Sequence, residues 1–241
     1  MDWPNTLQVD LELILQTLKR LGQPSLKKML IRNHGVSEPC WGVKIGDLKP
    51  MIRRFKNRQD LAYALYDTSN YDAMILAGLI ADPKAFKRQD LTRWLENARG
   101  GSLASHTVPR LVALGPHAWV LGSRWIELKN TRKRAAGWVV LGMLALSQAD
   151  ESLDMQRLSS WMHRVEASIH DECHEVQYAM NGFLIQVGCG VLALHQRAKE
   201  IAARVGRLDL NLGNNACQCP EALAYLERSA RKGVIGKKRS L

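Results

Sequence analysis

Apolar residues recur at helical spacing along almost the whole chain. In residues 7–22, Leu7, Leu11, Ile14, Leu18 and Leu21 fall on one face of a helix. The alternation that marks strands is almost absent, and only residues 207–212 resemble a short strand. The sequence therefore predicts an all-α protein of medium-length helices joined by short turns. The further helices are expected at 47–56, 59–68, 71–81, 88–98, 102–114, 116–127, 132–147, 154–169, 174–187, 191–204 and 220–232.

Glycines recur inside three of these helices with similar apolar neighbours. Gly137 and Gly182 lie 45 residues apart, and Gly78 is a third candidate. Because a glycine inside a helix costs about 0.5–1 kcal/mol, its repeated use indicates close helix packing. A spacing of roughly 40–47 residues is typical of HEAT and armadillo repeats, so we expect an α-solenoid of stacked helical hairpins with a basic concave face. A globular cluster of helices with coincidental glycine spacing is the alternative.

The chain is strongly basic. Lys and Arg number 34 against 23 Asp and Glu, a net charge of +11 among 241 residues. This excess favours a polyanionic partner such as nucleic acid or an anionic membrane surface, and a basic protein without such a partner is the alternative. We expect a single repeat domain at 1–232 and a basic C-terminal tail at 233–241.

Several sequence features bear on location. No apolar run reaches the roughly 18–20 residues that span a bilayer, and no signal peptide is recognisable at the N-terminus. Five scattered cysteines fit reduced thiols, so we expect a cytoplasmic protein.

The positive charge is concentrated in three blocks. The second block begins the predicted helix 132–147, where the helix dipole disfavours cations unless an anion such as a phosphate lies in front of them. Stripes of cations at helix ends would suit the regularly spaced phosphates of DNA. The blocks are Lys49, Arg53, Arg54, Lys56 and Arg58; Lys129, Arg132, Lys133 and Arg134; and Arg228, Arg231, Lys232, Lys237, Lys238 and Arg239.

Several segments, spread over nearly the whole chain, resemble the AlkD-type DNA alkylation repair family. They are WGVKIGDLKPMIRR (41–54), YDAMILAGLIADP (71–83), AAGW (135–138), YAMNGFLIQVG (178–188), NNACQCPEALAYLER and GVIGKKR. The resemblance implies a HEAT-like solenoid that cradles duplex DNA in a basic groove. For active members it also implies cleavage of N3- or N7-alkylated purines from damaged DNA without metal or organic cofactor.

The family's catalytic residues do not all carry over. Active members place an aspartate four residues after a tryptophan, and none of the seven tryptophans here has that neighbour. The two positions fall on Ala104 and Val108, which can do no electrostatic work. The later tryptophan of the family matches Phe183, and its phosphate-binding arginine matches Arg134 or Lys133.

Other residues near these positions are candidates to replace the missing pair. His106 could order a water or contact a phosphate, although a packing or surface histidine is the alternative. Glu175 is expected to pair with Arg134 across related repeats. The tryptophans are expected mainly in the core, with Trp138 the first candidate for stacking on a base. His170, Cys173, His174, Cys217 and Cys219 lack the ligand spacing of a zinc site, so no metal is expected.

Two functions therefore remain open. One is a monomeric protein that binds duplex DNA, with glycosylase activity on alkylated bases. The other is a non-enzymatic scaffold that binds nucleic acid or protein. The residues expected to contact DNA are Lys49, Arg53, Arg54, Arg132, Lys133, Arg134, Trp138, Phe183, Lys237, Lys238 and Arg239, and His106 is the candidate for a catalytic role.

Overall fold

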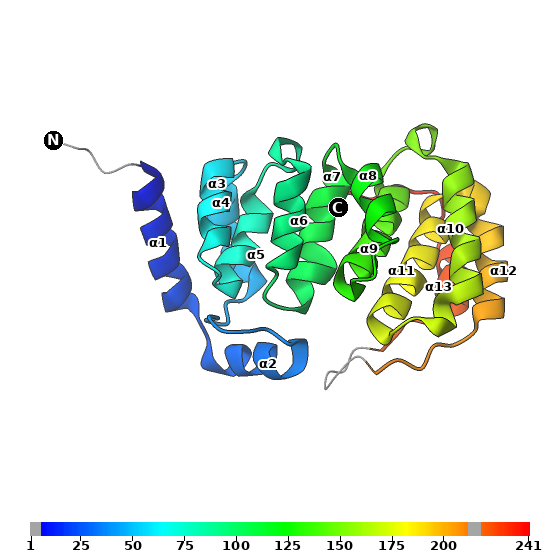
Figure 1. The fold of residues 1–241 in the computed structure, drawn as a ribbon, viewed down its shortest axis with the longest axis horizontal. Coiled ribbons are helices and arrows are strands. Elements are labelled where there is room, and N and C mark those ends of the chain that lie inside the picture. Colours follow the sequence, from blue (N-terminus) through cyan, green and yellow to red (C-terminus); the bar gives the residue numbers. More distant parts are fainter. Residues whose placement is uncertain (1–5, 212–217) are drawn as a thin grey trace. The chain divides into compact units, whose positions relative to one another are not determined.

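The computed structural model describes residues 6–211 and 218–241. Every regular element in these two stretches is a helix (Figure 1). Residues 207–211 form no regular element, so the expected short strand is absent from the described residues, and residue 212 lies outside them. The described chain divides into two compact units, which are residues 6–111 (unit 1) and residues 112–211 with 218–241 (unit 2).

Unit 1 is built from helices of which α1, α3 and α4 all pack against α5. Its elements are α1 (Thr6–Leu21), α2 (Pro24–His34), η1 (Ile45–Leu48), α3 (Lys49–Phe55), α4 (Gln59–Asp67), α5 (Tyr71–Ile80), η2 (Pro83–Ala85), α6 (Arg88–Glu96) and η3 (Leu103–Thr107). Helix α7 (Val108–Leu114) runs across the boundary between the units. Helices α4 and α5 form the central hairpin. The Trp94 ring stacks on Tyr66 with centroids 3.8 Å apart, and Trp94 is fully buried.

A buried carboxylate fixes the loop that precedes α3. Asp72, in the first turn of α5, is 2% exposed and accepts hydrogen bonds from the backbone N–H groups of Trp41, Gly42 and Val43 at 2.6, 3.1 and 2.8 Å. Asn70 caps α5 by accepting from the N–H groups of Asp72 and Ala73. Asp72 is therefore a structural residue, whose charge is satisfied by three amides.

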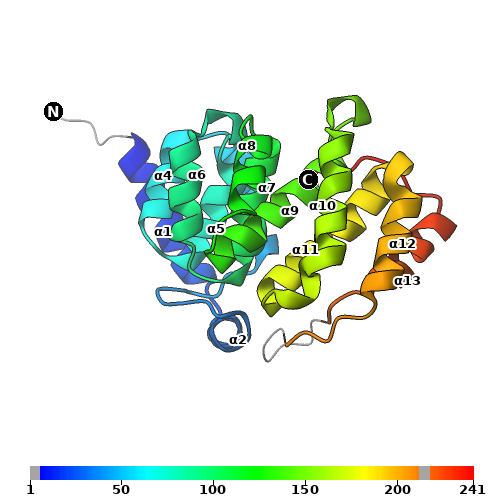
Figure 2. The same cartoon turned by 45° about the vertical axis from the view of Figure 1, so that its right-hand side comes forward.

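Helix α2 is the element that the periodicity missed. It runs across one end of the other unit 1 helices (Figures 1 and 2), and none of its residues is buried. Since little of it packs, its apolar pattern is weak. Its boundaries were nevertheless in the sequence, because Pro24 occupies the first turn and Gly35 ends the helix with φ +60°.

Unit 2 is organised around two 17-residue helices. Its elements are α8 (Ala118–Trp125), α9 (Thr131–Ser147), η4 (Asp150–Ser152), α10 (Met155–Ser168), η5 (Ile169–Asp171), α11 (His174–Gly190), η6 (Leu192–Leu194), α12 (His195–Val205) and α13 (Ala222–Arg231). Helices α9 and α11 pack against each other along their length, α8 pairs with α9, and α12 and α13 cover α11.

The mid-helix glycines have different roles. A Cβ at Gly137 would lie 2.8 Å from the Ile126 nitrogen and 3.0 Å from the Gly122 oxygen, so α8 and α9 require glycine there. A Cβ at Gly78 would lie 2.2 Å from Thr107 Cγ2. Close packing is thus confirmed at these two glycines. For Gly182 the expectation was wrong, because a Cβ there would meet nothing within 4 Å.

Among the described residues, no single helix is long and apolar enough to cross a membrane. One bent pair, His174–Gly190 with Leu192–Val205, meets the requirements of length and composition only when its two helices are taken together.

Candidate nucleic-acid interface

The first basic surface lies on α3 in unit 1. Met51 and Phe55 are buried, four residues apart, and fix the inner face of this helix. Lys49, Arg53 and Lys56 are exposed and share the outer face at i, i+4 and i+7. None of the three forms an ion pair with a carboxylate in the part of the chain that the structure describes. We call these three residues and Arg54 the α3 cations.

Arg54 and Arg58 differ from the other three cations of this block in having neighbours of their own, an aromatic ring for Arg54 and two carboxylates for Arg58. The Arg54 guanidinium lies 5.0 Å from the centroid of the Phe55 ring, although the residue is exposed. Arg58 pairs with Asp10 at 3.1 Å and with Asp60 at 2.9 Å. Arg58 therefore links α1 to the start of α4 and does not belong to the α3 cations.

The segment where the family's catalytic pair would lie is a turn of π-helix. Residues Leu103–Thr107 form η3, an uncommon geometry that often marks functional sites. Ala104 is 7% exposed and Val108 is fully buried, so neither position faces a ligand. His106 is exposed, and desolvation by surrounding atoms, together with Arg110, lowers its pKa below the ordinary value.

The second basic surface surrounds the start of α9 in unit 2. Asn130 caps the helix, and its side-chain oxygen accepts from the Lys133 N–H at 3.0 Å. Arg132 is exposed, and Lys133 and Arg134 are half-buried. The three cations therefore lie at a helix N-terminus that is already capped by Asn130. A phosphate bound there would find that the Lys133 N–H is already hydrogen-bonded.

Arg134, one of the two residues (with Lys133) expected to match the family's phosphate-binding arginine, is paired with a carboxylate. Its Nη2 lies 2.9 Å from Oε2 of Glu172, with the two side chains 24% and 17% exposed. Its Nε is buried without a hydrogen-bond partner among the described residues. The expected partner Glu175 is exposed one turn further along and is not the residue that pairs, so that expectation was wrong. Glu172 is the residue that ends the η5 turn. Because it lies outside an α-helix, the spacing of residues along a helix could not identify it as the partner of Arg134.

The two aromatic candidates lie in the core. Trp138 and Phe183 are both 0% exposed, and their ring centroids are 5.1 Å apart between α9 and α11. The Arg164 guanidinium, which the sequence did not single out, lies 5.6 Å from the Trp138 centroid and pairs with Glu127. Neither aromatic ring reaches the surface, so a base contact would require this core to open.

The C-terminal basic tail packs onto unit 2. The Lys238 ammonium donates to the carbonyl oxygens of Ala145 and Gly190 at 3.0 and 2.7 Å, and it lies 2.6 Å from Asp150 Oδ1. The Arg239 N–H donates to the Leu146 oxygen. Lys238 therefore joins the ends of α9 and α11, whereas Lys237 and Arg239 remain exposed.

The histidines considered as metal ligands have backbone groups as neighbours. His170 Nε2 lies 3.1 Å from the Val205 oxygen, and His174 Nδ1 accepts from the Asn211 N–H. Cys217 lies outside the described residues. Within the described ranges, no three His, Cys, Asp or Glu side chains are grouped so that they could hold a metal ion.

Comparison with known proteins decides the family. A family model described as "DNA alkylation repair enzyme" matches residues 14–199, most of the chain. The chain belongs to this family. The all-α HEAT-like fold is also confirmed, because one solved structure matches with a TM-score of 0.88 and 33% identity, covering 96% of this chain and 98% of the other. That structure is described as "a new family of proteins related to the HEAT-like repeat DNA glycosylases with affinity for branched DNA structures".

Two bacterial relatives also align with most of this chain. The uncharacterized proteins Lmo0209 of Listeria monocytogenes and Lin0241 of Listeria innocua are each 28% identical to this chain over 220 residues. Each alignment spans 89% of this chain and 95% of the relative. This member of the DNA alkylation repair family is thus similar to its relatives over nearly their full length.

Proposed function

We propose that this protein binds DNA, and branched DNA more tightly than plain duplex, without cleaving alkylated bases. The observation that carries the proposal is the likeness, at 33% identity and over nearly the whole chain, to a structure from a family with affinity for branched DNA. The α3 cations provide an exposed, unpaired surface for phosphates, since every backbone contact releases counterions.

The chemistry of η3 and α7 separates binding from base excision. A purine that leaves as a cation generates positive charge on the sugar, which a nearby carboxylate would stabilise. Here the two corresponding positions hold Ala104 and Val108, both buried and apolar. An aspartate at position 108 would be a buried charge without a partner, which the fold would disfavour. These two positions therefore supply no carboxylate to stabilise the sugar cation during base excision.

The proposal is tested with purified protein and three DNAs of the same length and composition: a duplex, a fork and a three-way junction. We expect the fork and junction to bind more tightly than the duplex, with affinities that fall steeply as salt rises. Alkylated duplex incubated with the protein should release no 7-methylguanine. Equal affinity for all three DNAs, or release of the methylated base, would contradict the proposal. The monomeric state and cytoplasmic location stay predictions.

A further inference from the structure

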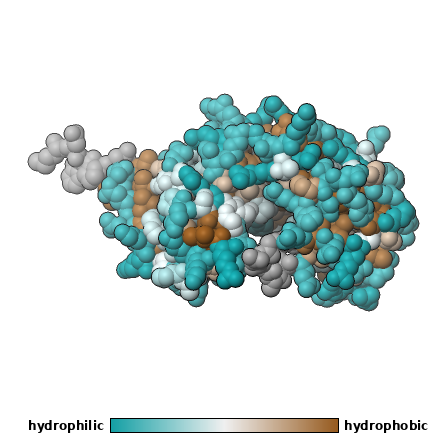
Figure 3. Space-filling view, turned by 60° about the horizontal axis from the view of Figure 1, so that its bottom comes forward, coloured by the Kyte–Doolittle hydropathy of each residue, from teal (hydrophilic) through white to brown (hydrophobic). Residues whose placement is uncertain are grey.

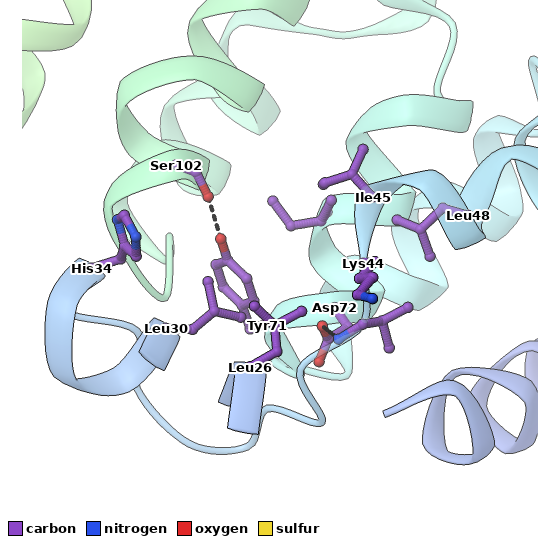
Figure 4. Close-up of a pocket in the computed structure, with 11 residues that line it drawn as sticks. Leu26, Leu30, His34, Lys44, Ile45, Leu48, Tyr71, Asp72 and Ser102 are labelled. Atoms are coloured by element: carbon purple, nitrogen blue, oxygen red, sulfur yellow. Dashed lines mark hydrogen bonds between the residues drawn. The ribbon is translucent and has the colours of Figure 1, made fainter. Parts of the chain in front are cut away.

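Unit 1 contains an apolar pocket whose lining includes Leu48, the residue before Lys49 at the start of α3. It has a volume of about 380 Å³, within the range of about 300–1,000 Å³ usual for small-ligand sites. Its wall comes from α2, the loop before η1, the start of α5 and the residue before η3 (Figure 4). The lining residues are Leu26, Leu30, His34, Val43, Lys44, Ile45, Leu48, Tyr71, Asp72, Ile75 and Ser102.

The pocket has a few polar groups on an apolar wall. The hydroxyls of Tyr71 and Ser102 are hydrogen-bonded to each other (Figure 4). The Asp72 carboxylate is satisfied by three backbone amides, so it requires no cation from a ligand. Lys44 and His34 are exposed among the lining residues, and Lys49 follows at the start of α3. The chemistry fits a flat, largely apolar group attached to an anion.

The wall remains open to solvent in this structure. Ile45 is 58% exposed, which is high for a large apolar side chain, and Leu30 is only half-buried. Figure 3 shows apolar surface on the unit 1 side of this face, bordered by residues of intermediate and of hydrophilic character. Apolar surface that stays uncovered beside a basic surface is typical of a ligand site.

We propose that this pocket takes one unpaired nucleobase of a branched DNA while the α3 cations and Lys44 hold its phosphates. The inference rests on the proposed DNA binding and names the feature of branched DNA that the protein recognises. A base must leave its stack to enter a pocket, and this costs least where it is already unpaired, as at a branch point. A base in the pocket would contact the Tyr71 ring and the leucine and isoleucine side chains, contacts that any base can make.

The test uses the full chain and a three-way junction carrying one unpaired 2-aminopurine at the branch. Leu30→Gln with Ile45→Gln places polar groups in the pocket without changing the charge. Both side chains are partly exposed, so we expect the fold to be retained, and circular dichroism checks it. Ile31→Gln is the matched control, because Ile31 is exposed on the same helix and does not line the pocket.

We expect the double variant to bind the junction about tenfold more weakly than the wild type and to bind duplex unchanged. The 2-aminopurine emission should change on binding of the wild type and of Ile31→Gln, but not on binding of the double variant. Junction binding that the double variant keeps in full, with the same emission change, would overturn the proposal. Unaltered emission with intact wild-type binding would also overturn it and assign the pocket to another ligand, such as an apolar peptide. Absence of any DNA binding by the wild type would instead refute the proposed function.

Discussion

The α3 cations of unit 1 and the cations near the two ends of α9 in unit 2 differ in the ion pairs and hydrogen bonds that they already form within the protein. Lys49, Arg53 and Lys56 stand exposed on one helical face, with no carboxylate paired to them among the described residues. In unit 2, Arg134 is paired with Glu172 and Lys238 is bonded to two carbonyls and Asp150. A phosphate gains most from cations that need not first leave another partner. We therefore expect unit 1 to contribute more of the DNA affinity than an equal count of charges in unit 2.

The largest effect on DNA affinity is expected when the exposed charges of α3 are removed. The triple variant Lys49→Ala, Arg53→Ala, Lys56→Ala should weaken junction binding at low salt by on the order of 100-fold, and the slope of log affinity against log salt should become shallower by about 2–3. Fluorescence anisotropy across a salt series measures both. The triple variant Lys84→Ala, Lys87→Ala, Arg88→Ala removes the same charge from exposed residues of unit 1 that belong to η2 and the start of α6 and not to α3. Equal losses in the two variants would show that net charge alone matters.

Lys238 of unit 2 should contribute to the free energy of unfolding and little to DNA affinity. Lys238→Met leaves the Ala145 and Gly190 carbonyls and Asp150 without their ammonium, so we expect a loss of about 1–3 kcal/mol in the free energy of unfolding. Urea unfolding measures it. Lys237→Met changes the same charge at an exposed neighbour and should leave the unfolding midpoint unchanged. If both variants unfold alike, the tail is not held by Lys238.

The smallest effect on junction affinity is expected from a change beside Arg134. Glu172→Gln removes the carboxylate that competes with phosphate for its guanidinium, so junction affinity should rise about two- to fivefold. Glu175→Gln makes the same charge change in the first turn of α11, at a carboxylate that does not pair with Arg134, and should raise affinity less. A fall in affinity for Glu172→Gln would mean that the carboxylate positions Arg134 for DNA and does not compete with it.

The sequence predicted elements well and side-chain partners poorly, for a physical reason. Helical periodicity reports burial, so the well-packed helices such as α9 and α11 were found, whereas α2, with no buried residue, was missed. Close packing at Gly137 followed from its cost inside a helix. The pairing of Arg134 depends on where the η5 turn ends, and the burial of Trp138 and Phe183 depends on how α9 meets α11. Such tertiary contacts leave no local pattern in a single sequence.

The most direct measurement is the reactivity of individual lysines toward an acetylating reagent, with and without the three-way junction, read by mass spectrometry. The exposed Lys49 and Lys56 should react in the free protein and be protected by the junction. Lys84 and Lys87 should react in both states, and Lys238 should react slowly in both. Protection of Lys84 and Lys87 while Lys49 and Lys56 stay reactive would contradict DNA binding on the α3 face.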